Sequence, residues 1–195
     1  MIALPIRIPD LPSMDNDRLY NFCVYNPELK IERNHKGELL IMAPTGGETG
    51  NRNFFINGII FAYLKQKSPK GKFFDSSTGF LLPNKAIRSP DASWISVDRW
   101  NALRPEERKK FVPLAPDFLI ELLSESDELA FAQIKMQEWM ENGVRLAWLL
   151  DPFQKMSYIY RQNRELEIIS GMGNLNGEDV LHEFELDLSG IYGEI

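Results

Sequence analysis

One acidic residue and one lysine lie in apolar stretches, where a charge is costly unless it has a partner, and a second acidic residue stands at the start of a predicted strand. Glu121 lies inside an apolar run, Asp91 follows the turn-forming pair Ser89-Pro90, and Lys135 lies in an apolar stripe four residues before Trp139. Burying a charged side chain without a partner is strongly unfavourable. We therefore expect Glu121 to belong to a site or to a buried ion pair, and the site is the favoured interpretation.

This set of residue types fits the chemistry of a hard divalent cation. If Asp91 and Glu121 lie on neighbouring strands, their carboxylates can converge on one Mg²⁺, with the main-chain carbonyl of Leu122 as a further ligand. Mn²⁺ is the alternative metal. A nearby lysine would orient or deprotonate the attacking water, or neutralise charge that develops on a phosphoryl group. Lys135 could instead lay its stem along apolar surface and expose its amine to water.

The elements around these residues decide whether they can meet. The sequence predicts a strand at 117–123, in which Glu121 and Leu123 point to one side and Leu122 to the other. A helix follows at about 126–141 and ends at the Asn142-Gly143 pair, which is typical of a left-handed helix cap. Ala132, Lys135 and Trp139 share one helical face, which favours Lys135 over Gln133 and Glu138 as the side chain that approaches Glu121.

The rest of the chain alternates helical and strand patterns. A short amphipathic helix is expected at 14–24, a hairpin turning at 34–37, and a helix from Thr45 with Glu48 completing a capping box. The buried side of that helix is expected to contain Phe54, Phe55, Ile59, Phe61 and Leu64. Strands are expected within 72–83, 89–97 and 144–152, a surface helix or loop at 98–111, and a closing hairpin over 155–169. This order predicts an α/β fold with a mixed β-sheet flanked by helices, in one domain spanning residues 1–195.

Composition excludes several classes of protein. The single cysteine, Cys23, cannot form an internal disulfide, and His35 and His182 have no ligand-spaced neighbours, which argues against a zinc site. No apolar run approaches the roughly 20 residues that span a bilayer, and the amino terminus lacks the pattern of a signal peptide. We therefore expect a cytoplasmic protein without membrane contact.

The charge balance argues against binding nucleic acid by electrostatics alone. The 195 residues include 22 basic and 28 acidic side chains, a net charge of −6. Local basic runs at 65–72 and 104–110 could contact nucleic acid, but solvated loop and helix ends are the favoured interpretation.

Long stretches of the sequence resemble a known family. These are IERNHKGELLIMAPTGGETGNRN, STGFLLPNKAIRSPDASWIS, APDFLIELLSESDELAFAQIKMQEWMENGVRLAWLLDP and FELDLSGIY. They are similar to the Uma2 family of putative restriction endonucleases, in the PD-(D/E)XK nuclease superfamily, along nearly the whole chain. The resemblance implies a restriction-endonuclease-like core and metal-dependent hydrolysis of DNA phosphodiesters. Nucleases of this superfamily often pair to cut two strands, so the resemblance also implies a homodimer.

The resemblance also implies roles for individual residues. Asp91 matches the motif aspartate and Glu121 the strand glutamate. The usual lysine two residues after the glutamate is replaced by Leu123, and Lys135 on the following helix matches it instead. Glu48 resembles the acid that some members place on the first core helix, although the capping box explains it equally well.

Two further acids and one further function have to be considered. Asp117 is expected to mark the mouth of its strand, and Asp75 is a weak candidate for an additional ligand. The alternative to a Mg²⁺-dependent endonuclease is a catalytically inactive nucleic-acid-binding or scaffold protein that has kept the same fold and the same residues.

Overall fold

The computed structural model describes residues 4–6 and 14–193. Part of the amino-terminal stretch that was compared above with a signal peptide lies outside these described residues. The last two residues of the expected domain lie outside them as well. The elements in chain order are β1 Leu4–Ile6, α1 Asn16–Tyr25, β2 Lys30–Arg33, β3 Leu39–Met42, α2 Gly47–Lys67, β4 Gly71–Asp75, β5 Phe80–Leu81, β6 Ile87–Arg88, β7 Ala92–Ser96, α3 Val97–Ala102, the 3-10 helix η1 Glu107–Lys109, β8 Phe118–Leu122, α4 Leu129–Glu141, β9 Leu146–Asp151, β10 Met156–Arg161, β11 Glu167–Ser170, β12 Asn174–Asn176, β13 Glu185–Asp187 and α5 Ser189–Tyr192.

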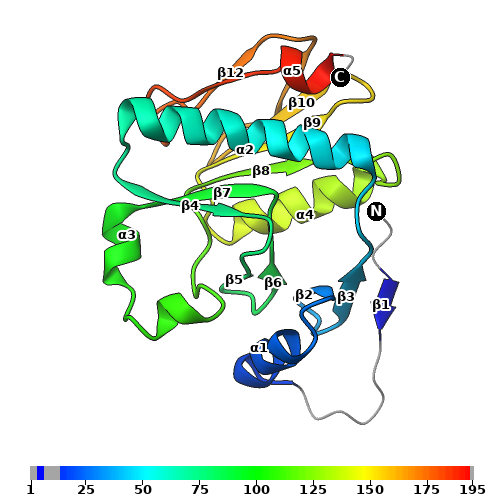
Figure 1. Ribbon diagram of the computed structural model, residues 1–195, viewed down its shortest axis with the longest axis vertical. Helices are drawn as coiled ribbons and strands as arrows, with labels where there is room; N and C mark the ends of the chain where they lie inside the picture. Colours follow the sequence, from blue (N-terminus) through cyan, green and yellow to red (C-terminus); the bar gives the residue numbers. More distant parts are fainter. Residues whose placement is uncertain (1–3, 7–13, 194–195) are drawn as a thin grey trace.

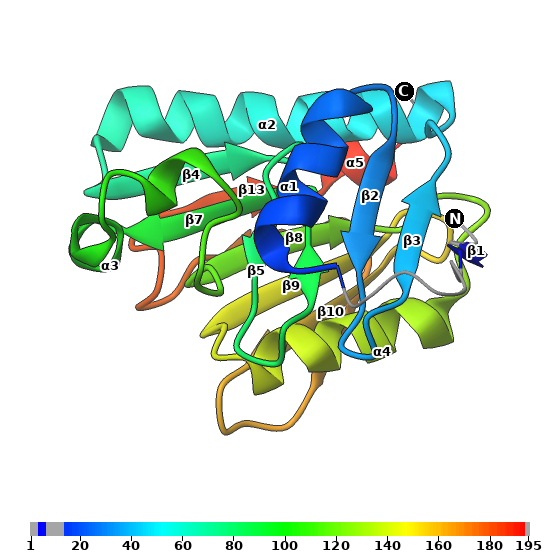
Figure 2. The same ribbon diagram turned by 90° about the horizontal axis from the view of Figure 1, so that it is seen from below.

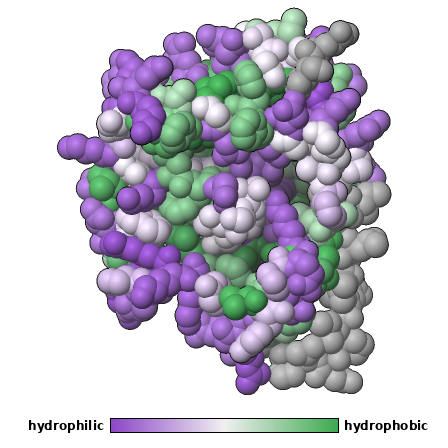
Figure 3. Space-filling model, in the orientation of Figure 1, coloured by the Kyte–Doolittle hydropathy of each residue, from purple (hydrophilic) through white to green (hydrophobic). Residues whose placement is uncertain are grey.

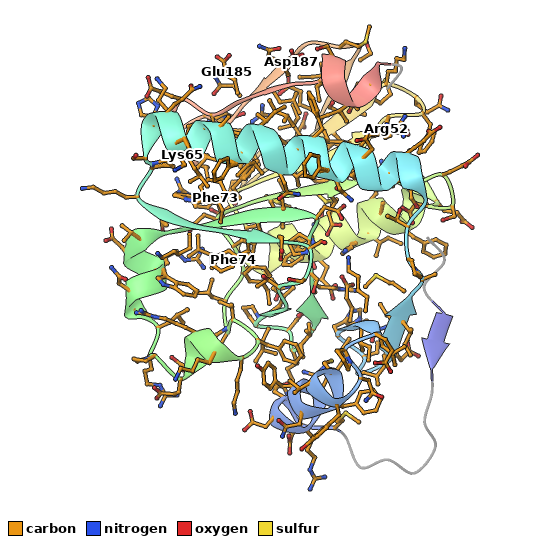
Figure 4. All side chains as sticks on the ribbon, in the orientation of Figure 1. Arg52, Lys65, Phe73, Phe74, Glu185 and Asp187 are labelled. Carbon is orange, nitrogen blue, oxygen red and sulfur yellow. The ribbon has the colours of Figure 1, made fainter. Side chains whose placement is uncertain are left out.

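The larger sheet has six strands in the order β11-β10-β9-β8-β7-β4, and only β8 and β9 run parallel. Helix α2 covers one face of this sheet and α4 covers the other, as Figure 1 shows. Adjacent Phe73 and Phe74 on β4 point to opposite faces of the sheet (Figure 4). Phe73 packs against the core on the α2 side, and Phe74 packs against the core on the α4 side. The mixed α/β class expected from the sequence is confirmed.

The central strand β8 is buried on both faces, because it lies between the two helical layers. Phe118, Ile120 and Leu122 pack towards α2, whereas Leu119 and Leu123 pack towards α4. Alternation along the strand therefore sends Glu121 to the α4 side, as the sequence predicts.

A smaller antiparallel sheet, in the order β1-β3-β2-β6-β5, lies beside the larger one with α1 packed against it (Figure 2). The expected hairpin of β2 and β3 is confirmed, with Ile31 opposite Ile41. Strand β6 was not expected, because it lies in a stretch that the sequence pattern indicates as a break between strands. Strands β12 and β13 and helix α5 follow the predicted closing hairpin of β10 and β11, and they were not expected either.

Helix α2 has a different buried face from the one expected. Its buried apolar residues are Ile56, Ile60 and Tyr63, whereas Phe54 is 78% and Phe61 60% exposed. Phe55 is also exposed, and only Ile59 and Leu64 of the expected set pack against the core. In the view of Figure 3, apolar and hydrophilic groups share the surface of the upper half, where α2 lies. Among the described residues, no helix is long and apolar enough to cross a membrane.

Candidate active site

Asp91 lies next to the strand that contains Glu121. Strands β7 and β8 pair antiparallel with Ala92 opposite Ile120, so Asp91, the residue just before β7, lies next to the end of β8 that contains Glu121. Oδ2 of Asp91 accepts a hydrogen bond from the Leu122 amide at 2.8 Å, and Oδ1 accepts one from Asn53 Nδ2 at 3.4 Å. The adjacency of the two strands that a shared site requires is therefore present.

Lys135 reaches the site from helix α4. Its Nζ lies 2.8 Å from Oε1 of Glu121 and 3.2 Å from Oε1 of Glu32, and its side chain is only 22% exposed. The contact expected between the helix lysine and the strand glutamate is present. The alternative, in which the amine extends into water, is wrong because the ammonium lies between two carboxylates.

Trp139 supplies a second donor to the same glutamate oxygen. Its indole Nε1 donates to Oε1 of Glu121 at 2.9 Å, and the ring itself is fully buried. Lys135 and Trp139 are four residues apart on α4, so they present their donors from adjacent turns of one helical face. The sequence places Trp139 on this face but gives no sign that its indole would bond Glu121.

The carboxylate of Glu32 enters the site from the smaller sheet, which the sequence does not reveal. Oε1 of Glu32 accepts a hydrogen bond from the Ser89 amide at 3.0 Å, and Oε2 pairs with Nη1 of Arg88 at 2.9 Å. Nε and Nη2 of Arg88 both contact Oε2 of Glu138 at 2.6 Å. Arg88 therefore bridges two carboxylates, one from β2 and one from α4.

Polar groups on two loops contact Glu138, the last carboxylate of this network. Oε1 of Glu138 accepts a hydrogen bond from Asn84 Nδ2 at 3.0 Å and lies 3.2 Å from His35 Nδ1. Glu138 lies three residues after Lys135, so helical spacing could have indicated that they share a side of α4. Glu32 gives no such signal, because it is one of three charged residues in a strand of four.

Burial and neighbouring charges move the pKa values of these groups in different directions. Burial raises the pKa of Glu121, and the Asp91 and Glu32 carboxylates raise it further against the opposing effect of Lys135. Burial also acts to raise the pKa of Glu32, but Lys135, Arg88 and the Ser89 amide outweigh it and lower that pKa. Burial acts to lower the pKa of Lys135, yet Glu121 and Glu32 hold it above its ordinary value. Lys135 is therefore a cation in this arrangement.

The donor atoms at this site suit a hard cation. Among the described residues, no group of three or more His, Cys, Asp or Glu side chains is arranged to hold a metal ion. Mg²⁺ needs fewer protein ligands, since one or two carboxylates completed by water and phosphate oxygens are its usual set in proteins. Burial is the main cause of the raised pKa of Glu121, and the Asp91 and Glu32 carboxylates add to it; a divalent cation would offset this second contribution.

Glu48 is placed differently from the expectation. Helix α2 begins at Gly47 with Gly46 as its N-cap, and no side chain caps it, so the predicted capping box is wrong. The reason is register: Thr45 lies one residue before the cap, and Glu48 is then the second helical residue rather than the third. The Glu48 side chain is 80% exposed and pairs with Arg52 at 3.3 Å.

The remaining acidic candidates have structural partners. Asp117 is buried at the start of β8, where it accepts the Ser96 amide at 2.8 Å and pairs with Arg99 at 3.0 Å. Asp75 is exposed at the end of β4 and accepts hydrogen bonds from the amide and hydroxyl of Ser77. Both arrangements explain the acid without a ligand.

Several members of the two basic runs are paired within the chain. Lys67 pairs with Glu183, Arg104 with Glu106 and Glu107, and Lys110 with Asp17. The interpretation of these runs as solvated ends of elements fits such pairing.

Comparison with known proteins gives one family and one fold. The model of the Uma2 family, described as putative restriction endonuclease, matches residues 17–189. A crystal structure of a putative nuclease belonging to DUF820, from Anabaena variabilis, superposes with a TM-score of 0.69. It is 18% identical in sequence, and the match covers 85% of this chain and 90% of that one. No curated protein matches the sequence.

Proposed function

We propose that this chain, which belongs to the Uma2 family of putative restriction endonucleases, is a metal-dependent endonuclease that hydrolyses phosphodiester bonds in DNA with water as the nucleophile. One observation carries the proposal. Asp91 directly precedes β7, the strand that pairs with the β8 strand of Glu121, its carboxylate bonds the Leu122 amide next to Glu121, and the ammonium of Lys135 lies 2.8 Å from Glu121. Two carboxylates and a cationic side chain are the groups that phosphodiester hydrolysis assisted by a metal needs.

Asp91 and Glu121 would hold Mg²⁺ or Mn²⁺, with the Leu122 carbonyl as a further oxygen donor. Such an ion, when bound, polarises the phosphate and makes water a stronger nucleophile near neutral pH. The Leu122 amide and Asn53 fix the Asp91 carboxylate, and the Trp139 indole fixes that of Glu121. The ligands are therefore oriented before any ion arrives.

Lys135 acts as a cation in this proposal. Because the neighbouring carboxylates raise its pKa, the amine carries its proton at neutral pH and is a poor acceptor for a proton from water. We therefore favour its donation of hydrogen bonds to the attacking water or to a phosphoryl oxygen. Charge that develops on the phosphoryl group would strengthen this contact in the transition state, which is the requirement for a catalytic effect.

The proposal is tested by nicking of supercoiled plasmid DNA in the presence of Mg²⁺. Asp91→Asn, Glu121→Gln and Lys135→Met each remove one charge without adding bulk and should lower the nicking rate about 100-fold or more. Chelation of Mg²⁺ should stop the wild-type reaction. Equal rates in all four proteins would show that the activity arises elsewhere, and a wild-type protein that never nicks DNA with Mg²⁺ or Mn²⁺ would refute the proposal.

The non-catalytic alternative has its own supporting observation. In this structure the Lys135 ammonium already contacts the carboxylate of Glu121, and the chain has a net charge of −6. A protein of this kind would retain DNA on a filter without cutting it, and Lys135→Met would leave that retention unchanged.

A homodimer belongs to the endonuclease proposal, since two sites are needed to cut two strands.

A further inference from the structure

Lys135 has two carboxylate acceptors, and only Glu121 belongs to the proposed metal site. Nζ of Lys135 lies 2.8 Å from Glu121 Oε1, the oxygen that also accepts the Trp139 indole N–H. The ammonium is therefore placed at an oxygen that would ligate a divalent cation. A cation and an ammonium repel each other, so they compete for this oxygen.

The second acceptor, Glu32, is fixed independently of Lys135. The Ser89 amide binds its Oε1 at 3.0 Å, and Arg88 binds its Oε2 at 2.9 Å. Its side chain is only 3% exposed, and Arg88 is itself held by Glu138. Glu32 lies on β2 of the smaller sheet and Glu121 on β8 of the larger one, so separate strands hold the two carboxylates.

We propose that Glu32 is a positioning residue that keeps the Lys135 ammonium beside the site when Glu121 exchanges this ammonium for a divalent cation. The inference rests on the proposed function and deepens it. Lys135 already contacts Glu32 at 3.2 Å, so the exchange at Glu121 leaves one ion pair in place. The same lysine then lies within the site, with hydrogen-bond donors available for water or a phosphoryl oxygen.

Without Glu32, the ammonium would have one carboxylate in the site. It would then either stay on Glu121 and exclude the cation or leave for water through the exposed part of its side chain. The first outcome weakens metal binding and the second removes the lysine from the reaction. Glu32→Gln should therefore impair both; Gln keeps the shape of the side chain, but its single acceptor oxygen replaces only one of the two oxygens that accept from Ser89 and Arg88.

The test is a double-mutant cycle on Mn²⁺ affinity, measured from the electron paramagnetic resonance signal of free Mn²⁺ with the full chain. In the presence of Lys135, Glu32→Gln should weaken Mn²⁺ binding about tenfold. In the Lys135→Met background the same change should weaken it by no more than about twofold, because no ammonium remains to be placed. Equal effects in the two backgrounds would show a simple loss of negative charge and would overturn the inference, as would no effect in either.

Glu138→Gln is the matched control, because Glu138 is the other buried carboxylate on Arg88, whereas Lys135 pairs with Glu32 and Glu121. Its effect on Mn²⁺ affinity should be the same with and without Lys135, and a coupling as large as that of Glu32 would assign the effect to Arg88 and overturn the inference.

Glu32→Asp keeps the charge and should restore most of the affinity and of the nicking rate lost in Glu32→Gln. If Glu32→Gln does not fold, Glu32→Asp replaces it in the double-mutant cycle with Lys135→Met. Its coupling to Lys135 in Mn²⁺ affinity should have the same sign and be smaller. An additive cycle with Glu32→Asp overturns the inference.

The two proposals fail in different ways. A wild-type chain whose Mn²⁺ binding is absent or insensitive to Asp91→Asn would refute the proposed function and this inference together. A wild-type chain that binds Mn²⁺ through Asp91 and nicks DNA, but gives an additive cycle, would refute only the role of Glu32. At saturating Mn²⁺ and DNA, Glu32→Gln should still lower kcat, since the lysine is no longer placed. An unchanged kcat would contradict the positioning role.

Discussion

Replacing Arg88 by methionine should strongly destabilise the fold. The Arg88 side chain is 11% exposed and lies between Glu32 and Glu138, which are 3% and 9% exposed. Methionine fills similar space but leaves two buried carboxylates near each other without their shared cation. Removing one partner of a buried ion pair typically costs about 3–5 kcal/mol. We expect the low end of this range, because Glu32 still pairs with Lys135 and Glu138 still accepts a hydrogen bond from Asn84.

The cost of Arg88→Met should depend on pH. The pKa of Glu32 in the folded protein lies below its ordinary value of 4.5, so its ionised form stabilises the fold at pH above about 4.5. That stabilisation is lost as the pH falls through the lower pKa of the folded state. Without Arg88 the pKa of Glu32 rises. The difference in unfolding free energy between the two proteins should therefore be largest near pH 7 and shrink below about pH 4.5.

Urea unfolding at pH 7 and pH 4 measures both effects. Asp17→Asn is the control, because Asp17 and Lys110 are also only 2.8 Å apart but their side chains are 71% and 48% exposed. Water screens such a pair, and its loss should cost no more than about 1 kcal/mol. Equal costs for the two variants at pH 7, or a cost of Arg88→Met that grows towards pH 4, would refute this reasoning.

Three further predictions follow from the same geometry. Trp139→Phe should lower the unfolding free energy in urea by about 1–3 kcal/mol, because Glu121 loses a buried hydrogen-bond donor and the smaller ring leaves a void. A change below about 0.5 kcal/mol, which is typical of surface substitutions, would contradict this. Glu48→Ala should leave the plasmid nicking rate within about twofold of wild type, because its carboxylate lies in solvent, and a loss comparable to that of Asp91→Asn would return Glu48 to the site. Light scattering should give a mass of twice 22.5 kDa, and a monomer at all concentrations would contradict the proposed homodimer.

The sequence predicts most of the larger sheet and its two covering helices, because their patterns are long. Strand β8 and helix α4 are delimited by an apolar run and by Gly143, whose φ of +101° suits a residue without a side chain. The buried face of α2 was mispredicted because the helix is rich in aromatic residues on several sides. Helix α2 packs on the sheet only when it is rotated so that Ile56 and Ile60 point to the sheet. Phe54, two positions before Ile56, then lies about 200° away from Ile56 around the helix axis.

The candidate site was predictable where a charge stands out from its sequence surroundings and unpredictable where it stands among other charges. Glu121 and Lys135 are visible because they lie in apolar stretches, and Asp91 because it follows a turn and matches the family motif. Glu32 and Arg88 lie on strands of four and two residues, whose pairing is decided by contacts far away in the chain. Such non-local pairing leaves no periodic pattern, so the ion pairs that fix Lys135 appear only in three dimensions.

The central claim is that Asp91 and Glu121 together hold a divalent cation. Crystals grown with Mn²⁺ test it most directly, because anomalous scattering locates the ion without assumptions about substrate or rate. We predict one peak with oxygen atoms of Asp91 and Glu121 at about 2.1–2.3 Å, and with the Lys135 ammonium moved from Glu121 to Glu32. A peak bound by other residues, or none at a Mn²⁺ concentration that supports nicking, would contradict the account.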